Sequence, residues 1–206
     1  MKSFEEKYNV SRETFELLKS YEKLLREWQQ KFNLVSNASL EDCWNRHFLD
    51  SVQLYQYIPE SAKLVYDFGS GAGFPGMVLA IMAKEKTPYL KFKLIESVRK
   101  KTLYLKEVAQ MSGANVEIVN ERIEKLPPEK ADVITSRAMA SLKELLEYTY
   151  KFCKTETVCI FPKGKKYAEE ITEAKKYWNF KCLLKPSEQS EEGRILIITG
   201  LRNKRR

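Results

Sequence analysis

The chain has 206 residues, of which 43% are hydrophobic, enough to bury the core of one globular domain. Its formal net charge of +8 favours polyanionic partners, nucleic acid above all. The first ten residues lack an apolar signal segment, and the longest apolar run is too short to span a bilayer, so we expect a cytoplasmic protein that makes no use of a membrane.

Disulfide bonds and metal sites are not expected. The chain has four cysteines without any CxxC spacing and a single histidine, His47. A structural metal site needs about four clustered nitrogen or sulfur ligands. The sequence offers no such set, so we expect the cysteines to be reduced residues of the core.

Helices are predicted to come first. Apolar residues recur every three or four positions from Ser11 to Phe32, which is the helical period. A second helix is predicted from Ser39 to about Tyr57, because Ser39 followed three residues later by Asp42 resembles a capping box. We expect residues 1–60 to form a helical cap packed on a second unit, residues 61–206.

After Pro59, short apolar runs alternate with amphipathic ones. Strands are predicted at 63–68, 91–96, 116–120, 131–136, 157–162, 180–185 and 194–200, and helices at 75–84, 97–111, 141–152 and 167–177. This alternation predicts a mostly parallel sheet with helices on both faces. The last two strands have no helix between them and residues 186–193 resemble a loop, so we expect a terminal antiparallel hairpin.

A glycine-rich turn follows the first strand, in the segment DFGSGAGFPG (67–76). The first strand-to-helix turn of a doubly wound sheet lines the ligand crevice. Gly71, Gly73 and Gly76 satisfy the dinucleotide pattern GxGxxG, and Glu96 lies about 20 residues further on, where that pattern places an acid for ribose hydroxyls. The same segment fits the pattern of methyltransferases that bind S-adenosylmethionine, an acid followed by three alternate glycines: Asp67, Gly69, Gly71, Gly73.

Two features favour S-adenosylmethionine over a nicotinamide cofactor. Asp67 at the strand end can help to hold the methionine ammonium group, a cation that dinucleotides lack. The predicted antiparallel last strand is typical of the methyltransferase sheet. The third possibility is a glycine-rich turn that packs tightly and binds no ligand. The distance in sequence between the turn and Glu96 would then be a coincidence.

Six segments together resemble one family, the bacterial 16S rRNA guanine-N7 methyltransferases of the RsmG (GidB) type. They are FNLVS (32–36), RHFLDS (46–51), DFGSGAGFPG (67–76), RIE (122–124), SRAMASL (136–142) and FPKGK (161–165). They occur in the family's order over much of the chain. Phe74 stands where the family often has leucine, a difference that keeps the position apolar.

The resemblance implies a class I S-adenosylmethionine-dependent methyltransferase fold, Rossmann-like, with an N-terminal helical extension. It implies methylation of N7 of a guanine in 16S rRNA, guanine 527 of the 530 loop, within the small ribosomal subunit or an assembly intermediate. Nothing in the sequence suggests an obligate dimer, so we expect a monomer. The resemblance also implies that Gly69 and Phe74 contact the cofactor, that Glu96 binds the ribose, that Ile123 and Glu124 frame the adenine, and that Arg137 lies at the methionine end.

Two absences agree with guanine N7 as the acceptor. The fourth strand is not followed by the Asn/Asp-Pro-Pro-aromatic motif of amine methylases, and no cysteine follows a proline as in cytosine-C5 enzymes. Guanine N7 has a free lone pair and no proton to remove, so no general base is required. Catalysis would then consist of aligning the acceptor, the methyl carbon and the sulfur in line.

Basic residues are assigned to RNA phosphates rather than to the base. The candidates are Arg122, Lys163, Lys165, Arg202, Arg205 and Arg206. Each one alone is more simply a solvated surface charge, but together they suggest RNA.

His47, Asp50 and Ser51 share one helix face by their spacing, and we expect them to brace the helical cap against the glycine turn. Three other functions stay open at this point: methylation of a small molecule or protein, a nicotinamide-dependent oxidoreductase, and an RNA-binding module without transfer activity.

Overall fold

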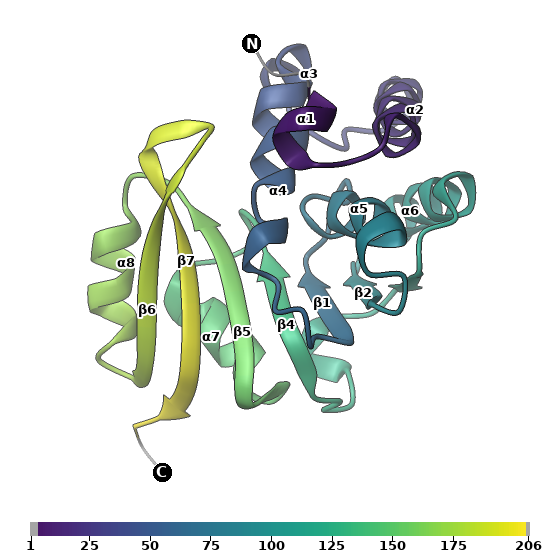
Figure 1. Ribbon diagram of the computed structural model, residues 1–206. Helices are drawn as coiled ribbons and strands as arrows, with labels where there is room; N and C mark the ends of the chain where they lie inside the picture. Colours follow the sequence, from purple (N-terminus) through teal and green to yellow (C-terminus); the bar gives the residue numbers. More distant parts are fainter. Residues whose placement is uncertain (1–3, 205–206) are drawn as a thin grey trace.

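The computed structural model describes residues 4–204 (Figure 1). Its single sheet has seven strands: β1 (Leu64–Phe68), β2 (Lys91–Ile95), β3 (Val116–Val119), β4 (Ala131–Ser136), β5 (Cys153–Lys163), β6 (Trp178–Ser187) and β7 (Ser190–Asn203). The strand order is β3-β2-β1-β4-β5-β7-β6, with β1 to β5 parallel and β7 antiparallel to both of its neighbours. The predicted α/β class, mostly parallel with an antiparallel terminal hairpin, is confirmed.

The loop predicted between the last two strands is wrong. Ser187 pairs with Ser190 and Pro186 with Arg194, so the ladder continues almost to the tip of the hairpin. The polar composition suggested a loop, but β6 is an edge strand, where proline and charged residues are tolerated. The tip is also fixed from outside, because the backbone N–H of Glu188 donates to Gln53 Oε1 at 2.8 Å.

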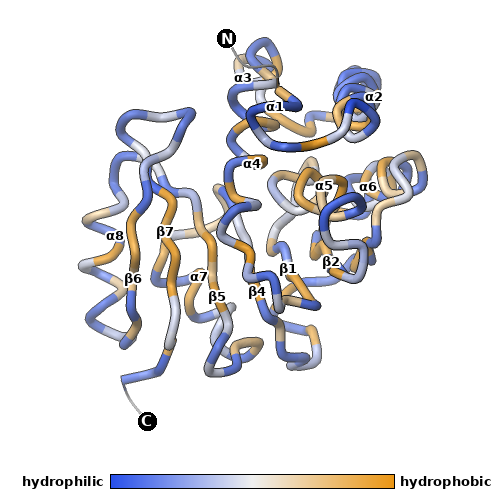
Figure 2. The backbone as a smooth tube through the Cα atoms, in the orientation of Figure 1, coloured by the Kyte–Doolittle hydropathy of each residue, from blue (hydrophilic) through white to orange (hydrophobic). Residues whose placement is uncertain are grey.

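Helices cover both faces of the sheet, as predicted. α5 (Gly76–Lys86) and α6 (Arg99–Ser112) lie on one face, and α7 (Leu142–Tyr150) and α8 (Tyr167–Ala174) lie on the other (Figure 1). Successive strand residues alternate between the two sides: Val65 joins the apolar cluster with α5 and α6, whereas Tyr66 joins the cluster with α7 and α8. Figure 2 shows the strands and α5 as the most hydrophobic parts of the chain.

The N-terminal extension consists of α1 (Phe4–Tyr8), α2 (Arg12–Gln29), α3 (Asn37–Glu41), the π-helix η1 (Trp44–Leu49), α4 (Asp50–Val52) and the 3-10 helix η2 (Tyr55–Tyr57). α2 agrees with the helical period of its apolar residues. It begins after Ser11, whose side chain accepts a hydrogen bond from the backbone N–H of Thr14.

The second predicted helix is wrong in its start and its continuity. The N-cap is Ser36, whose hydroxyl accepts from the backbone N–H of Ser39 at 3.3 Å, so Ser39 lies within the first turn. α3 ends at Glu41, Asp42 leaves the helical conformation (φ −106°, ψ 46°), and the chain continues as η1, in which His47 and Phe48 are both buried. Phe48 packs edge-on against Tyr21 and Phe74, a contact made across the fold that the local capping pattern could not reveal.

The N-terminal extension packs against the glycine turn. Tyr21 of α2 is fully buried, its hydroxyl donates to the carbonyl oxygen of Ala72, and its ring stacks on Phe74 with centroids 5.4 Å apart. Residues of α2 and η1 belong to the same apolar cluster as α5 and α6. The conformation of the turn therefore depends on packing against the extension.

Candidate functional site

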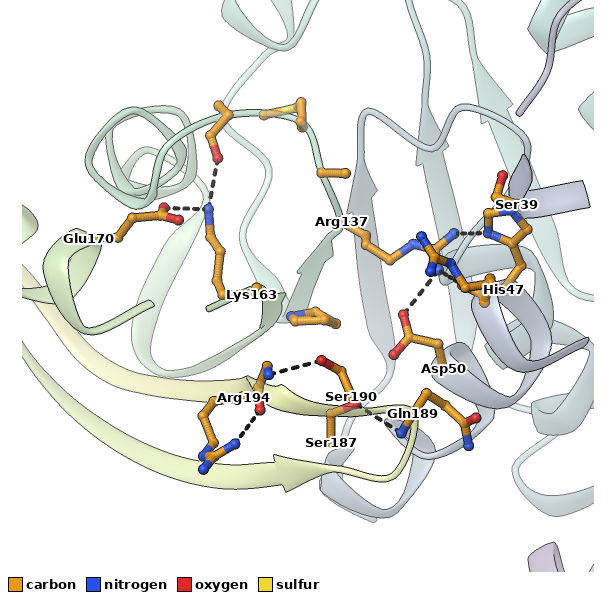
Figure 3. Close-up of a pocket in the computed structure, with 17 residues that line it drawn as sticks. Ser39, His47, Asp50, Arg137, Lys163, Glu170, Ser187, Gln189, Ser190 and Arg194 are labelled. Carbon is orange, nitrogen blue, oxygen red and sulfur yellow. Dashed lines mark hydrogen bonds and ion pairs between the residues drawn. The ribbon is translucent and has the colours of Figure 1, made fainter. Parts of the chain in front are cut away.

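Two cavities open at the carboxyl ends of β1 and β4, where the strand order reverses. The first cavity, about 580 Å³, lies between the glycine turn, the end of β2 and the 3-10 helix η3 (Ile123–Lys125). The second cavity, about 750 Å³, lies between η1, the segment after β4 and the β6–β7 hairpin (Figure 3). Among the described residues, Met139 and Ala140 alone line both cavities. A parallel α/β sheet binds its ligands at this edge.

Five of the nine residues predicted to bind the cofactor line the first cavity: Gly69, Gly71, Glu96, Ile123 and Glu124. Arg137 lines the second cavity instead. Asp67, Gly73 and Phe74 line neither of them.

Glu96 is held in place by the backbone. Its Oε2 accepts from the N–H of Gly71 at 2.9 Å, and its Oε1 accepts from the N–H of Val98 at 2.8 Å. Each carboxylate oxygen has two lone pairs, so both can still accept from the hydroxyls of a ribose in the cavity. The side chain is nearly buried, and this limits its freedom to turn away.

The glycines of the turn serve different purposes. Gly71 has φ +57°, and a Cβ there would meet nothing nearer than the carbonyl oxygen of Gly69 at 3.8 Å, so its surface is open to the cavity. A Cβ on Gly73 would lie 2.2 Å from the hydroxyl of Tyr21. Gly73 therefore admits the tyrosine of α2 rather than a ligand.

Asp67 and Phe74, which the sequence predicts to bind the cofactor, are buried and line neither cavity. Asp67 is fully buried and accepts a hydrogen bond at Oδ1 from the hydroxyl of Thr135 at 2.8 Å. Phe74 lies between Tyr21 and His47, with the His47 ring stacked on it at 4.8 Å. Both side chains are directed into the core by partners distant in sequence.

Burial raises the pKa of Asp67 to about 6 from 3.8, although the hydrogen bond from Thr135 acts in the other direction. The folded protein therefore keeps a proton that the unfolded chain has lost between these two values. The stability that this provides is complete below about pH 3.8 and is lost as the pH rises through about 6.

We expect Asp67→Asn to raise the melting temperature at about pH 8, where it removes a buried charge whose Oδ2 has no hydrogen-bond partner. At about pH 4, where the wild-type carboxyl is protonated, the gain should largely disappear. Thermal melts of both proteins at the two pH values test this. An equal rise in melting temperature at both pH values would contradict a buried charge on Asp67.

Arg137 is the centre of a network in the second cavity. Its guanidinium donates to Asp50 Oδ2 at 3.0 Å, to the carbonyl oxygen of Arg46 at 2.8 Å and to His47 Nδ1 at 2.8 Å (Figure 3). It also lies over the ring of Phe74, 5.3 Å from the centroid. The start of the segment after β4 is thereby attached to η1.

His47 is neutral at physiological pH. Burial, and next the charges of Arg137 and Arg46, lower the pKa of His47 to about 4. Because an arginine can only donate, Nδ1 is the acceptor and the ring proton is on Nε2, a buried atom without a hydrogen-bond partner. Ser51, predicted to act with His47, donates only to the His47 carbonyl oxygen within its own helix.

The four residues predicted to bind RNA that the structure describes do not form one surface. Lys163 is turned inward, to the carbonyl oxygen of Ala140 and to Glu170. Lys165 is exposed beyond the end of β5, and Arg122 lines the first cavity. Arg202 lies at the opposite end of the sheet, because β7 runs away from the cavities after Arg194. Arg205 and Arg206 are outside the described residues.

Several residues of the cavities were not predicted from the sequence. Arg46 and Arg194 line the second cavity, and Lys101 and Met139 line the first. Arg46 could have been found, because it begins the segment RHFLDS and lies next to His47. Met139 lies in another quoted segment, SRAMASL, but its residue type gave no signal, since a methionine after a strand is usually a packing residue.

The described part of the chain also lacks two features. Within residues 4–204, no group of His, Cys, Asp and Glu is arranged to hold a metal ion. In the same range, no helix has the length and apolar character needed to cross a membrane.

Comparisons with known proteins identify the family. The family described as "GidB: rRNA small subunit methyltransferase G" matches residues 14–194. The ribosomal RNA small subunit methyltransferase G of Parvibaculum lavamentivorans is 43% identical over 97% of this chain and 88% of its own length. The protein of the same name from Rhodospirillum centenum is 40% identical over 96% of this chain and 89% of its own length. A SAM-dependent methyltransferase from Aquifex aeolicus is similar in fold, with a TM-score of 0.57, 16% identity and coverage of 80% of this chain and 93% of its own.

Proposed function

Because the chain belongs to the GidB family, rRNA small subunit methyltransferase G, we propose that it transfers the methyl group of S-adenosylmethionine to N7 of a guanine in 16S rRNA. The observation that carries this proposal is the meeting of two cavities at Met139 and Ala140, one suited to the cofactor and one to a nucleobase. The resemblance of the sequence motifs supports guanine 527 of the 530 loop as the target.

The residues of the first cavity fit S-adenosylmethionine, which when bound supplies an electrophilic methyl group on a sulfonium. Gly71 leaves open backbone surface, and Glu96 presents a fixed carboxylate for ribose hydroxyls. Ile123, which is buried, and Ile95 provide apolar surface for an adenine ring. Among these residues, Gly69, Gly71, Glu96, Ile123 and Glu124 would hold the cofactor, while Asp67 supports the turn from behind.

The second cavity suits a base that needs no deprotonation. The histidine and the aspartate that line it already accept hydrogen bonds, since His47 Nδ1 and Asp50 Oδ2 both accept from Arg137. Guanine N7 requires no proton acceptor, and a positive charge develops on the ring during transfer. The two carboxylates that line this cavity, Asp50 and Glu170, are each paired with a cation, Arg137 and Lys163, so the cavity would act by positioning the base rather than by stabilising that charge.

RNA phosphates would bind around the second cavity. Arg46 is exposed there, and Arg194 lies on the facing hairpin. Arg46 comes from η1 and Arg194 from β7, and the guanidinium of Arg194 also donates to the carbonyl oxygens of Glu191 and Gly193 in its own hairpin. A nucleotide turned out of its stack could place its base between them. We place the reaction in the cytoplasm, carried out by a monomer on the small subunit or an assembly intermediate.

The test is to incubate the protein with S-adenosylmethionine and small ribosomal subunits that lack the modification, and then to analyse digested 16S rRNA by mass spectrometry. We expect 7-methylguanosine at a single site. A methyl group found on another atom or another nucleotide would refute the N7 assignment. Unmodified rRNA, together with tight binding of S-adenosylhomocysteine, would direct the search to other acceptors.

A further inference from the structure

The segment after β4 determines how the two cavities meet. Met139 and Ala140 line both of them, so a methyl group that passes between the cavities must pass beside these residues. In-line transfer is sensitive to displacements of about 1 Å, which can cost about a hundredfold in rate. Whatever fixes this segment therefore affects the rate of transfer.

The far end of the segment is fixed by a charge pair from β5 and α8. Lys163 Nζ donates to the carbonyl oxygen of Ala140 at 2.8 Å and to Glu170 Oε2 at 2.8 Å (Figure 3). The same oxygen of Glu170 accepts from the backbone N–H of Leu142, the first residue of α7, at 2.7 Å. Glu170 thus connects β5, α7 and α8 at the wall of the second cavity, next to Ala140, which lines both cavities.

The position of Lys163 depends on Glu170. The Lys163 side chain is only 10% exposed, and a nearly buried ammonium group is costly without a counter-charge. If the carboxylate of Glu170 were removed, the free energy of the Lys163 ammonium group would fall when it moved toward water. The carbonyl oxygen of Ala140 would then lose its hydrogen-bond donor.

The segment carries backbone strain near its start. Ala138 has φ +52°, a left-handed conformation that costs a residue with a Cβ on the order of 1 kcal/mol. Arg137 holds the near end through Asp50 and His47. At the far end Ser141 is held by its capping box with Glu144, but the carbonyl oxygen of Ala140 depends on Lys163 and Glu170, so loss of that pair would let this part of the strained segment relax.

We propose that Glu170 is a positioning residue for methyl transfer, acting through Lys163 and Leu142 on the wall that the two cavities share. This inference rests on the proposed transfer across Met139 and Ala140. It does not depend on which atom of the base receives the methyl group.

The experiment compares Glu170→Ala and Glu170→Gln with Glu169→Ala, an exposed residue of the same helix whose replacement changes the charge equally. Transfer of radiolabelled methyl groups to 16S rRNA in unmodified subunits is measured well below each melting temperature. We expect kcat to fall at least about tenfold in Glu170→Ala and less in Glu170→Gln, which can still accept from Leu142. The KM for subunits and the Kd for S-adenosylhomocysteine should stay within about twofold.

A kcat within about twofold of the Glu169→Ala control in both Glu170 variants would overturn the proposal. The label reports transfer to any atom of the rRNA, so label without 7-methylguanosine in the wild type refutes the N7 assignment alone. Hydrogen exchange provides a readout without activity. The backbone N–H of Leu142 should exchange faster in Glu170→Ala than in the control, and equal exchange would also overturn the proposal.

Discussion

Gly71→Val should abolish cofactor binding while the protein stays folded. The valine side chain would occupy the open surface of the first cavity, where the glycine Cα now has no neighbour that a Cβ would touch closely. We expect the Kd for S-adenosylhomocysteine, measured by calorimetry, to rise at least a hundredfold, about 2.8 kcal/mol. Methylation of rRNA should be lost with it.

The matched control for this substitution is Gly113→Val. Gly71 has φ +57° and Gly113 has φ +61°, so both variants carry the same backbone strain, on the order of 1–2 kcal/mol. Gly113 ends α6 away from both cavities, and a Cβ there meets only Lys84, at 3.5 Å. Both melting temperatures should fall, but only Gly71→Val should lose the ligand. Normal binding by Gly71→Val would show that the turn does not line the pocket.

The sequence allowed the backbone of the site to be predicted better than its side chains. The glycine pattern correctly placed the turn after β1 and Glu96 at the edge of the same cavity, because spacing along two parallel strands determines where their ends meet. It did not predict which residues surround Asp67 and Phe74. Their directions depend on Thr135 and Tyr21, residues from other elements that no local pattern connects to the turn.

Lys163 illustrates the same limit for charged residues. Within FPKGKK it resembles a solvated lysine suited to phosphates, and its neighbour Lys165 is indeed exposed. The partner that draws Lys163 inward, Glu170, lies on the following helix, and the carbonyl oxygen that it binds belongs to Ala140. Since a lysine has one charge and a flexible stem, its direction is decided by the tertiary structure.

Arg137→Ala should reduce methyl transfer far more than stability. The variant loses three hydrogen bonds that fix the segment after β4 to η1, and we expect kcat/KM to fall at least a hundredfold, about 2.8 kcal/mol. Asp50 keeps a hydrogen bond from Gln53, so the free energy of unfolding should fall by only about 1–3 kcal/mol. Steady-state kinetics and chemical denaturation measure the two effects. A large loss of stability with unchanged kinetics would contradict this assignment.

The same variant distinguishes two roles for Arg137. The sequence motifs implied that it reaches the methionine end of the cofactor, whereas the structure places it in the second cavity. If it acts only there, the Kd for S-adenosylhomocysteine should change less than about twofold in Arg137→Ala. A rise of tenfold or more would mean that the guanidinium contacts the cofactor after all.

The pKa of His47 tests the hydrogen bond from Arg137 without a measurement of activity. It is the only histidine of the chain, so its NMR titration is unambiguous. Without the charge of Arg137 the pKa of His47 should rise from about 4, whereas Arg46→Ala, which removes a weaker influence and leaves the hydrogen bond to Nδ1 intact, should raise it less. Equal shifts in the two variants would mean that the guanidinium of Arg137 does not bind the ring. The order of the two shifts therefore tests the contact by which the extension and the segment after β4 are joined.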